Sequence, residues 1–267
     1  MTGAKLLPTR TVAKPWGCDS LPAPFVAPDG ERIGEIWFEP DAALPDLLVK
    51  YLFTSEKLSV QVHPADAQAP AGSRGKEECW LVLSAEPDAC LAIGFREPVS
   101  AQAMRAAAVD GSIEQLLEWH AVQPGDFFYL PAGTVHAIGP GLALIEIQQN
   151  SDITYRLFDY GRPRELHLDE AVAVATGEPY PPAMQRRLRD GDSAVLVDGP
   201  HFRLERVCGL PDAGLAARFS SAALVVPVRG SVTADGLAVA AGQCAQVSSM
   251  GDVGFDPDGE ALVAAPI

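Results

Sequence analysis

The sequence has little positive charge and no cysteine pattern that points to a disulfide framework. Basic residues number 20 against 35 acidic ones, which gives a formal net charge of −15. A surface of that sign repels nucleic acid and anionic membranes, so we expect neither as a partner. The five cysteines are odd in number and contain no Cys-x-x-Cys pair, which favours buried, reduced thiols in a cytosolic protein.

Long apolar segments are missing as well. The opening stretch, MTGAKLLPTRTVAKPWG, lacks the apolar core of a secretory signal, and no apolar run reaches the roughly 18 residues that a membrane span needs. We therefore expect a soluble cytoplasmic protein, either a monomer or a homodimer.

Turn-forming residues are abundant, with 23 prolines and 24 glycines among 267 residues, and this favours a mainly β fold. Strand-like segments are predicted at 32–39, 46–53, 57–63, 78–85 and 89–95. A helical insertion is predicted at about 97–120, with Ser100 and Ser112 as N-caps, and a further short helix at 166–177 ends at Gly177. His120 is expected to end a helix in this insertion.

A proline-rich and then charged connector at 178–192 divides the predicted strands into two groups. We expect residues 1–178 to form a catalytic, metal-binding domain with the helical insertion. Residues 179–267 contain only strand and turn patterns, which predict a second, metal-free β domain with a structural role.

Two histidines stand in patterns that predict a metal site. In LSVQVHPADA, Gln61 and His63 are two residues apart, so they share one face of a strand. The segment PGDFFYLPAGTVHAIG (124–139) resembles the second cupin motif, with a strand, a tight Pro/Gly turn and then His136. Cupins are jelly-roll barrels, so the expected fold is two cupin-type barrels.

The first cupin motif normally supplies a His-x-His pair and a later glutamate, which correspond here to Gln61-x-His63 and Glu78. The predicted ligands of one divalent cation per chain are therefore Gln61, His63, Glu78 and His136. Two imidazoles, a carboxylate and an amide oxygen suit Zn²⁺, with manganese, iron or cobalt as alternatives. Glu77 is the alternative to Glu78. Cys79 is expected to face the opposite side of its strand.

These motifs, with their neighbours, resemble the type I mannose-6-phosphate isomerase family in its short bacterial form. The resemblance covers roughly residues 10–175. It is carried by LLVKYLFTSEKLSVQVHP, GKEECWLVL, LPAGTVHAIG and EIQQNSDITYRLFDYGR, and KPWGCDSL and RIGEIWFE are also similar. The resemblance implies the same ligand set, and the Lys-x-Glu register from Lys76 favours Glu78 over Glu77. It also implies a zinc-dependent reaction that interconverts mannose 6-phosphate and fructose 6-phosphate.

The resemblance also implies roles for residues around the metal. The catalytic group would be Arg156, Glu146, Asp152 and Lys76. The substrate-binding group would be Lys50, Ser59 and Arg162. The proton-transfer residue stays open among Glu146, Asp152 and Lys76.

Two departures from the family concern Gly75, where longer members often carry a histidine, and the much shorter helical insertion. Three other functions are therefore kept as alternatives: another metal-dependent cupin enzyme such as a dioxygenase, a non-catalytic sugar-phosphate-binding cupin, and an isomerase for a related phosphosugar.

Overall fold

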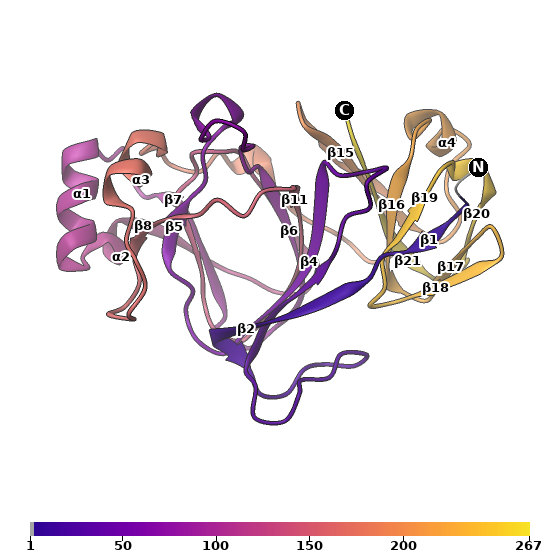
Figure 1. The fold of residues 1–267 in the computed structure, drawn as a ribbon, viewed down its shortest axis with the longest axis horizontal. Helices are drawn as coiled ribbons and strands as arrows, with labels where there is room; N and C mark the ends of the chain where they lie inside the picture. Colours follow the sequence, from indigo (N-terminus) through magenta and orange to yellow (C-terminus); the bar gives the residue numbers. More distant parts are fainter. Residues whose placement is uncertain (1–2) are drawn as a thin grey trace.

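Strands dominate the computed structural model, which describes residues 3–267. These residues form four sheets in which neighbouring strands pair in antiparallel fashion (Figure 1). The mainly β fold class predicted from the sequence is confirmed. Within residues 3–267, no helix has the length and apolar character needed to cross a membrane.

Two sheets build the barrel that carries the predicted metal ligands. The seven-stranded sheet has the order β13 (Gln185–Arg187), β9 (Asp126–Leu130), β6 (Glu78–Ala85), β11 (Leu142–Gln149), β4 (Leu47–Thr54), β3 (Ile33–Phe38) and β2 (Thr9–Cys18). The five-stranded sheet has the order β12 (Tyr155–Phe158), β5 (Val60–Val62), β10 (His136–Ile138), β7 (Cys90–Phe95) and β8 (Leu117–Ala121). One apolar core, with Trp80 and Leu144 from the first sheet and Ile93 from the second, fills the space between them.

Helices cover the outer face of the five-stranded sheet, at the left of Figure 1. They are α1 (Ala101–Asp110), α2 (Ile113–Leu116) and α3 (Leu168–Val174). Ser100 caps α1 as predicted, because its Oγ accepts a hydrogen bond from the backbone of Ala103 at 3.2 Å. The predicted helix before Gly177 is also confirmed. Ser112 stands at the N-cap position of α2 but makes no side-chain capping hydrogen bond.

The predicted helical insertion at about 97–120 is wrong in its last residues, from Leu117 onward. The helix α2 ends at Leu116, and the chain continues as strand β8, in which His120 pairs with Leu91 of β7. Pairing with β7 satisfies the backbone of this segment and places Leu117 in the core, which outweighs the helical preference of the Leu-Leu-Glu sequence.

The remaining strands form two further sheets. One has the order β1 (Lys5–Leu6), β19 (Ala245–Val247), β16 (Ala223–Arg229), β21 (Glu260–Pro266), β15 (Phe202–Cys208) and β14 (Ala194–Asp198). The other has the order β18 (Leu237–Ala240), β17 (Ser231–Ala234) and β20 (Val253–Phe255). The short helix α4 (Leu215–Arg218) and 3₁₀ turns at Asp66–Gln68, Pro182–Met184 and Met250–Asp252 complete the elements named here.

Several features tie the two halves of the chain together. The strand β1 lies in the C-terminal sheet beside β19, and β13 adds to the metal-binding sheet beside β9. A shared apolar core joins Val49 and Ile147 of the seven-stranded sheet to Leu224 and Leu262 of the C-terminal sheet.

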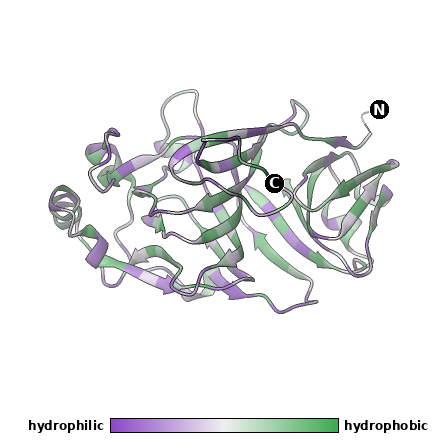
Figure 2. Cartoon of the chain, turned by 90° about the horizontal axis from the view of Figure 1, so that it is seen from below, coloured by the Kyte–Doolittle hydropathy of each residue, from purple (hydrophilic) through white to green (hydrophobic). Residues whose placement is uncertain are grey.

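Apolar and polar residues alternate along many strands of both halves (Figure 2). The division into domains 1–178 and 179–267 stays a prediction.

Candidate metal centre and pocket

Three buried side chains bring metal-ligating atoms together inside the barrel. His63, Glu78 and His136 each offer one such atom, and these atoms lie within 4.8 Å of one another. The strand β6 of one sheet carries Glu78, while His136 begins β10 of the facing sheet and His63 directly follows the end of β5, so the group bridges the barrel interior. The Nε2 atom of His63 is 3.5 Å from one carboxylate oxygen of Glu78, and that of His136 is 3.4 Å from the other.

The two imidazoles are oriented for ligation by hydrogen bonds on their other side. Nδ1 of His63 lies 2.7 Å from the carbonyl oxygen of Ile153, and Nδ1 of His136 lies 2.9 Å from that of Thr134. A carbonyl oxygen only accepts, so each Nδ1 carries the proton and each Nε2 lone pair faces the site. Burial lowers the pKa of His136 to about 4 and that of His63 well below its ordinary value. Both rings are neutral at pH 7, the state that binds metal.

Glu78 is buried and forms a close ion pair with Lys76, whose Nζ lies 2.5 Å from Oε2. Its other oxygen, Oε1, is buried and has no hydrogen-bond partner within residues 3–267. Burial raises the pKa of Glu78, and Lys76 opposes that shift. Ligand atoms of a tetrahedral metal at about 2.0–2.1 Å lie roughly 3.3–3.4 Å apart, close to the separations measured from Glu78 to the two histidines. The group therefore fits a divalent cation.

Gln61 lies beside this group, in the cross-strand position opposite His136. Its amide nitrogen is 3.2 Å from Nε2 of His136, and its oxygen accepts a hydrogen bond from Ser59 at 3.0 Å. Ligation through the oxygen requires the amide to turn over. Cys79 packs into the shared core on the other side of β6, as expected from strand alternation.

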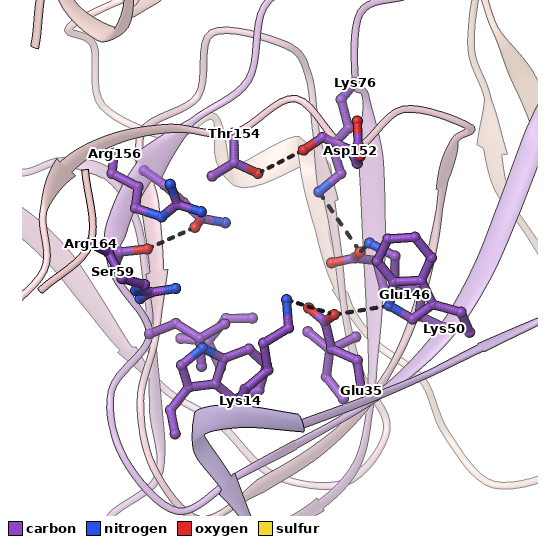
Figure 3. Close-up of a pocket in the computed structure, with 16 residues that line it drawn as sticks. Lys14, Glu35, Lys50, Ser59, Lys76, Glu146, Asp152, Thr154, Arg156 and Arg164 are labelled. Atoms are coloured by element: carbon purple, nitrogen blue, oxygen red, sulfur yellow. Dashed lines mark hydrogen bonds and ion pairs between the residues drawn. The ribbon is translucent and has the colours of Figure 1, made fainter. Parts of the chain in front are cut away.

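A pocket of about 230 Å³ lies beside this group (Figure 3). Gln61 and Lys76, which contact the group, line it, whereas the two histidines and Glu78 do not. Its basic lining residues are Lys14, Lys50, Lys76, Arg156 and Arg164. Its acidic lining residues are Glu35, Glu146 and Asp152. Positive charge therefore exceeds negative charge here, in a protein whose formal net charge is −15.

The register of three strands explains why Glu146 is central to the pocket. On β11, Glu146 pairs with Lys50 of β4 on one side and with Trp80 of β6 on the other. Both neighbours contact its carboxylate: Nζ of Lys50 at 3.0 Å, and Nε1 of Trp80, which donates a hydrogen bond at 3.0 Å. Burial alone would raise the pKa of Glu146, but Lys50 and Lys76 hold it below its ordinary value.

The two arginines among the predicted site residues, Arg156 and Arg162, lie in different environments. Arg156 lines the pocket, and within residues 3–267 its guanidinium makes no ion pair and its Nε is buried without a hydrogen-bond partner. Arg162 does not line the pocket and pairs with Asp159 and Glu56 instead. Arg164 lines the pocket in its place, held by two hydrogen bonds of 2.6 Å to Asp159.

Nine lining residues were not among the predicted site residues. Four of these have aliphatic or hydroxyl side chains, and the other five are charged or aromatic: Lys14, Trp16, Glu35, Trp37 and Arg164. Lys14 lies 3.0 Å from Glu35, which also accepts a hydrogen bond from Trp37 at 2.9 Å. The signal was present in the sequence, because Glu35 and Trp37 are spaced by two on a strand, as Gln61 and His63 are.

No family model matches the chain. Over 167 residues it is 42% identical to a mannose-6-phosphate isomerase from Streptococcus mutans, covering 58% of this chain and 52% of that protein. Over 137 residues it is 44% identical to mannose-6-phosphate isomerase ManA from Bacillus subtilis, covering 48% of this chain and 43% of that protein. The matched region thus spans about half the length of these curated relatives.

Solved structures extend the similarity of fold to nearly the whole chain. The crystal structure of mannose 6-phosphate isomerase from Bacillus subtilis superposes with a TM-score of 0.76 at 23% identity, covering 98% of this chain and 99% of that one. A phosphomannose isomerase variant from Salmonella typhimurium gives a TM-score of 0.70 at 16% identity, covering 99% and 100%. The resemblance predicted from the sequence is therefore confirmed: this chain is similar in sequence to proteins named mannose-6-phosphate isomerase, and similar in fold to solved structures of that name.

Proposed function

We propose that the protein is a zinc-dependent aldose–ketose isomerase that interconverts mannose 6-phosphate and fructose 6-phosphate. The observation that carries the proposal is a buried His63–Glu78–His136 group beside a pocket whose lining contains more basic than acidic residues. The names of the curated relatives supply the substrate. Zinc suits the nitrogen and oxygen donors, with Gln61 as the proposed fourth ligand.

Charge in the pocket favours a phosphate at the arginine end. Arg156 has no carboxylate partner within residues 3–267, so its guanidinium is available to a substrate oxyanion. Arg164 lies near enough to lower the pKa of Arg156, after the larger effect of burial. Two adjacent guanidinium groups bind a phosphate dianion through charge-assisted, bidentate hydrogen bonds, and the dianion relieves the repulsion between them.

The reaction moves a proton between C2 and C1 of the open-chain sugar through an enediol or enediolate. A divalent ion held by the buried ligand group supplies Lewis-acid polarisation of the sugar oxygens. The chain's own residues hold and move the proton. Glu146 and Glu78 raise the pKa of Lys76 against the effect of burial, so Lys76 is a protonated donor.

Asp152 is the proposed proton acceptor, since it lines the pocket and forms no ion pair within residues 3–267. Glu146 suits that role less well, because its lowered pKa and its contacts with Lys50 and Trp80 make it a weak base. We assign Glu146 to holding Lys50 in an ion pair and to raising the pKa of Lys76. Lys50 and Ser59 stay proposed substrate-side residues, since both line the pocket.

A coupled assay tests the proposal. The protein loaded with Zn²⁺ is incubated with mannose 6-phosphate, and the formation of fructose 6-phosphate is followed with and without a chelator. We expect turnover that is lost with the chelator and restored by Zn²⁺. Binding of mannose 6-phosphate without solvent-proton exchange at C1 or C2 would favour the non-catalytic alternative instead.

A further inference from the structure

Glu77, the alternative ligand in the sequence, has a distinct place in the structure. Neighbouring residues of a strand point to opposite sides, so Glu78 faces the metal site and Glu77 faces away from it. One carboxylate oxygen of Glu77 accepts a hydrogen bond from the hydroxyl of Tyr129. The other lies 3.7 Å from Nε2 of His201, which belongs to the C-terminal half of the chain.

His201 connects two carboxylates on the outer wall of the barrel. Its Nδ1 lies 3.6 Å from Asp66, while its Nε2 faces Glu77. Asp66 accepts hydrogen bonds from the backbone of Gly75 at 2.7 Å and from Gln149 at 3.2 Å. Gln149 in turn accepts a hydrogen bond from the backbone N–H of Glu77 at 2.9 Å. The contacts form a closed ring around the segment that leads into Glu78.

The turn between β14 and β15 fits closely against the same place. A Cβ atom added at Gly199 would lie 3.0 Å from the Tyr129 hydroxyl, a tight contact to which the tyrosine would have to adjust. The ring of Phe202, the first residue of β15, packs edge-on against that of Tyr129, with centroids 6.2 Å apart. Gly199, His201 and Phe202 therefore all lie against the Tyr129–Glu77 pair.

We propose that the β14–β15 turn, through His201 and its contact with Glu77, is a positioning element for the metal ligand Glu78. The C-terminal half thereby has a function in metal binding although it contributes no ligand to the centre. This inference rests on the proposed metal centre. The direction in which the Glu78 side chain points depends on the position of its backbone. Glu77 and Gln149 hold that backbone through the hydrogen bond between them, on the side opposite the metal site. Partners behind a ligand typically influence metal affinity by about 10–100-fold.

The test compares His201→Gln and Glu77→Gln with a control, Arg105→Gln, in the full-length protein. Arg105 lies on α1 and pairs with Asp169, outside the β14–β15 turn. Zn²⁺ affinity is measured by competition with a chromogenic chelator, and thermal unfolding is measured on the metal-free proteins. We expect both test variants to bind Zn²⁺ roughly ten-fold more weakly and the control to match the wild type.

The double variant, His201→Gln with Glu77→Gln, should lose less affinity than the sum of the two single losses, because both changes break the shared His201–Glu77 contact. His201→Gln replaces a partly exposed side chain, so it tests the inference even where Glu77→Gln fails to fold. Wild-type Zn²⁺ affinity in His201→Gln, even with a lowered melting temperature, would overturn the inference. A wild-type protein that binds no Zn²⁺ would instead overturn the metal centre itself.

Discussion

The substitution Arg156→Ala tests whether the Arg156 side chain acts on the substrate or only stabilises the fold. The guanidinium of Arg156 makes no ion pair within residues 3–267, and its buried Nε lacks a hydrogen-bond partner. Removing it therefore breaks no native hydrogen bond of that side chain. A buried donor without a partner costs about 1–3 kcal/mol, so its loss offsets the packing lost with the aliphatic stem. We expect a melting temperature close to that of the wild type.

The effect on catalysis should be much larger than the effect on stability. A hydrogen bond to a charged group contributes about 1.5–3 kcal/mol. Each 1.36 kcal/mol corresponds to a factor of ten in rate. Loss of one such bond to substrate therefore lowers kcat/KM about 10- to 150-fold, and loss of a bidentate pair lowers it further. Arg156→Lys should fall in between, since it keeps the charge but loses the planar fork.

The assay measures kcat/KM for mannose 6-phosphate together with Zn²⁺ content and thermal unfolding. Arg105→Ala is the matched control, because Arg105 lies on α1 and pairs with Asp169, outside the pocket. We expect Arg156→Ala to keep its metal and lose turnover. Near-normal turnover in a folded, metal-loaded Arg156→Ala protein would refute the assignment of Arg156 to the reacting substrate.

Three further predictions follow from the same geometry. Gln61→Ala and His136→Ala should lose Zn²⁺ and activity together, as measured by metal analysis and the coupled assay; full activity with no bound metal would contradict this. Arg164→Ala should lower kcat/KM at least ten-fold, whereas Arg162→Ala should chiefly lower the melting temperature; the reverse pattern would restore the prediction for Arg162. As the pH falls from about 6.5 towards 4, the metal-free wild type should lose stability relative to a His136→Gln variant, because burial lowers the pKa of His136 to about 4 and the unfolded chain takes up the proton first; protonation of Glu78 stabilises both folded proteins alike. The difference is about 3 kcal/mol, and equal pH profiles of the two proteins in urea unfolding would argue against it.

The sequence predicts the parts of the site that follow from local strand periodicity. Gln61 and His63 share a face because they are two residues apart, and Glu78 and Cys79 separate because they are adjacent. The Pro-Ala-Gly turn before His136 fixes where the next strand begins, with Gly133 at a φ of 85°. These local rules place each ligand on its strand, and the family resemblance indicates that the strands meet.

Long-range pairing decides what the sequence does not predict. Arg162 and Arg164 both follow Arg156 closely in the sequence, and in the structure both pair with the buried Asp159. Only the fold shows that Arg164, and not Arg162, lines the pocket. The segment 117–121 has helical composition, yet it becomes a strand because β7 needs a partner. Lys14 enters the pocket from β2 through its pairing with Glu35, a contact across a register shift that local patterns do not contain.

The charges of the pocket are arranged so that one end receives an anion and the other a cation. Most of the basic lining residues have a carboxylate of their own: Lys14 has Glu35, Lys50 has Glu146, Lys76 has Glu78, and Arg164 has Asp159. Arg156 has none within residues 3–267. Glu78, which pairs with Lys76, also lies beside two neutral imidazoles, and its Oε1 has no hydrogen-bond partner within residues 3–267. An unpaired guanidinium attracts an anion, whereas a buried carboxylate beside two neutral imidazoles attracts a cation. A phosphosugar whose phosphate lay at Arg156 and whose carbonyl lay by a metal ion held at Glu78 would meet both demands at once.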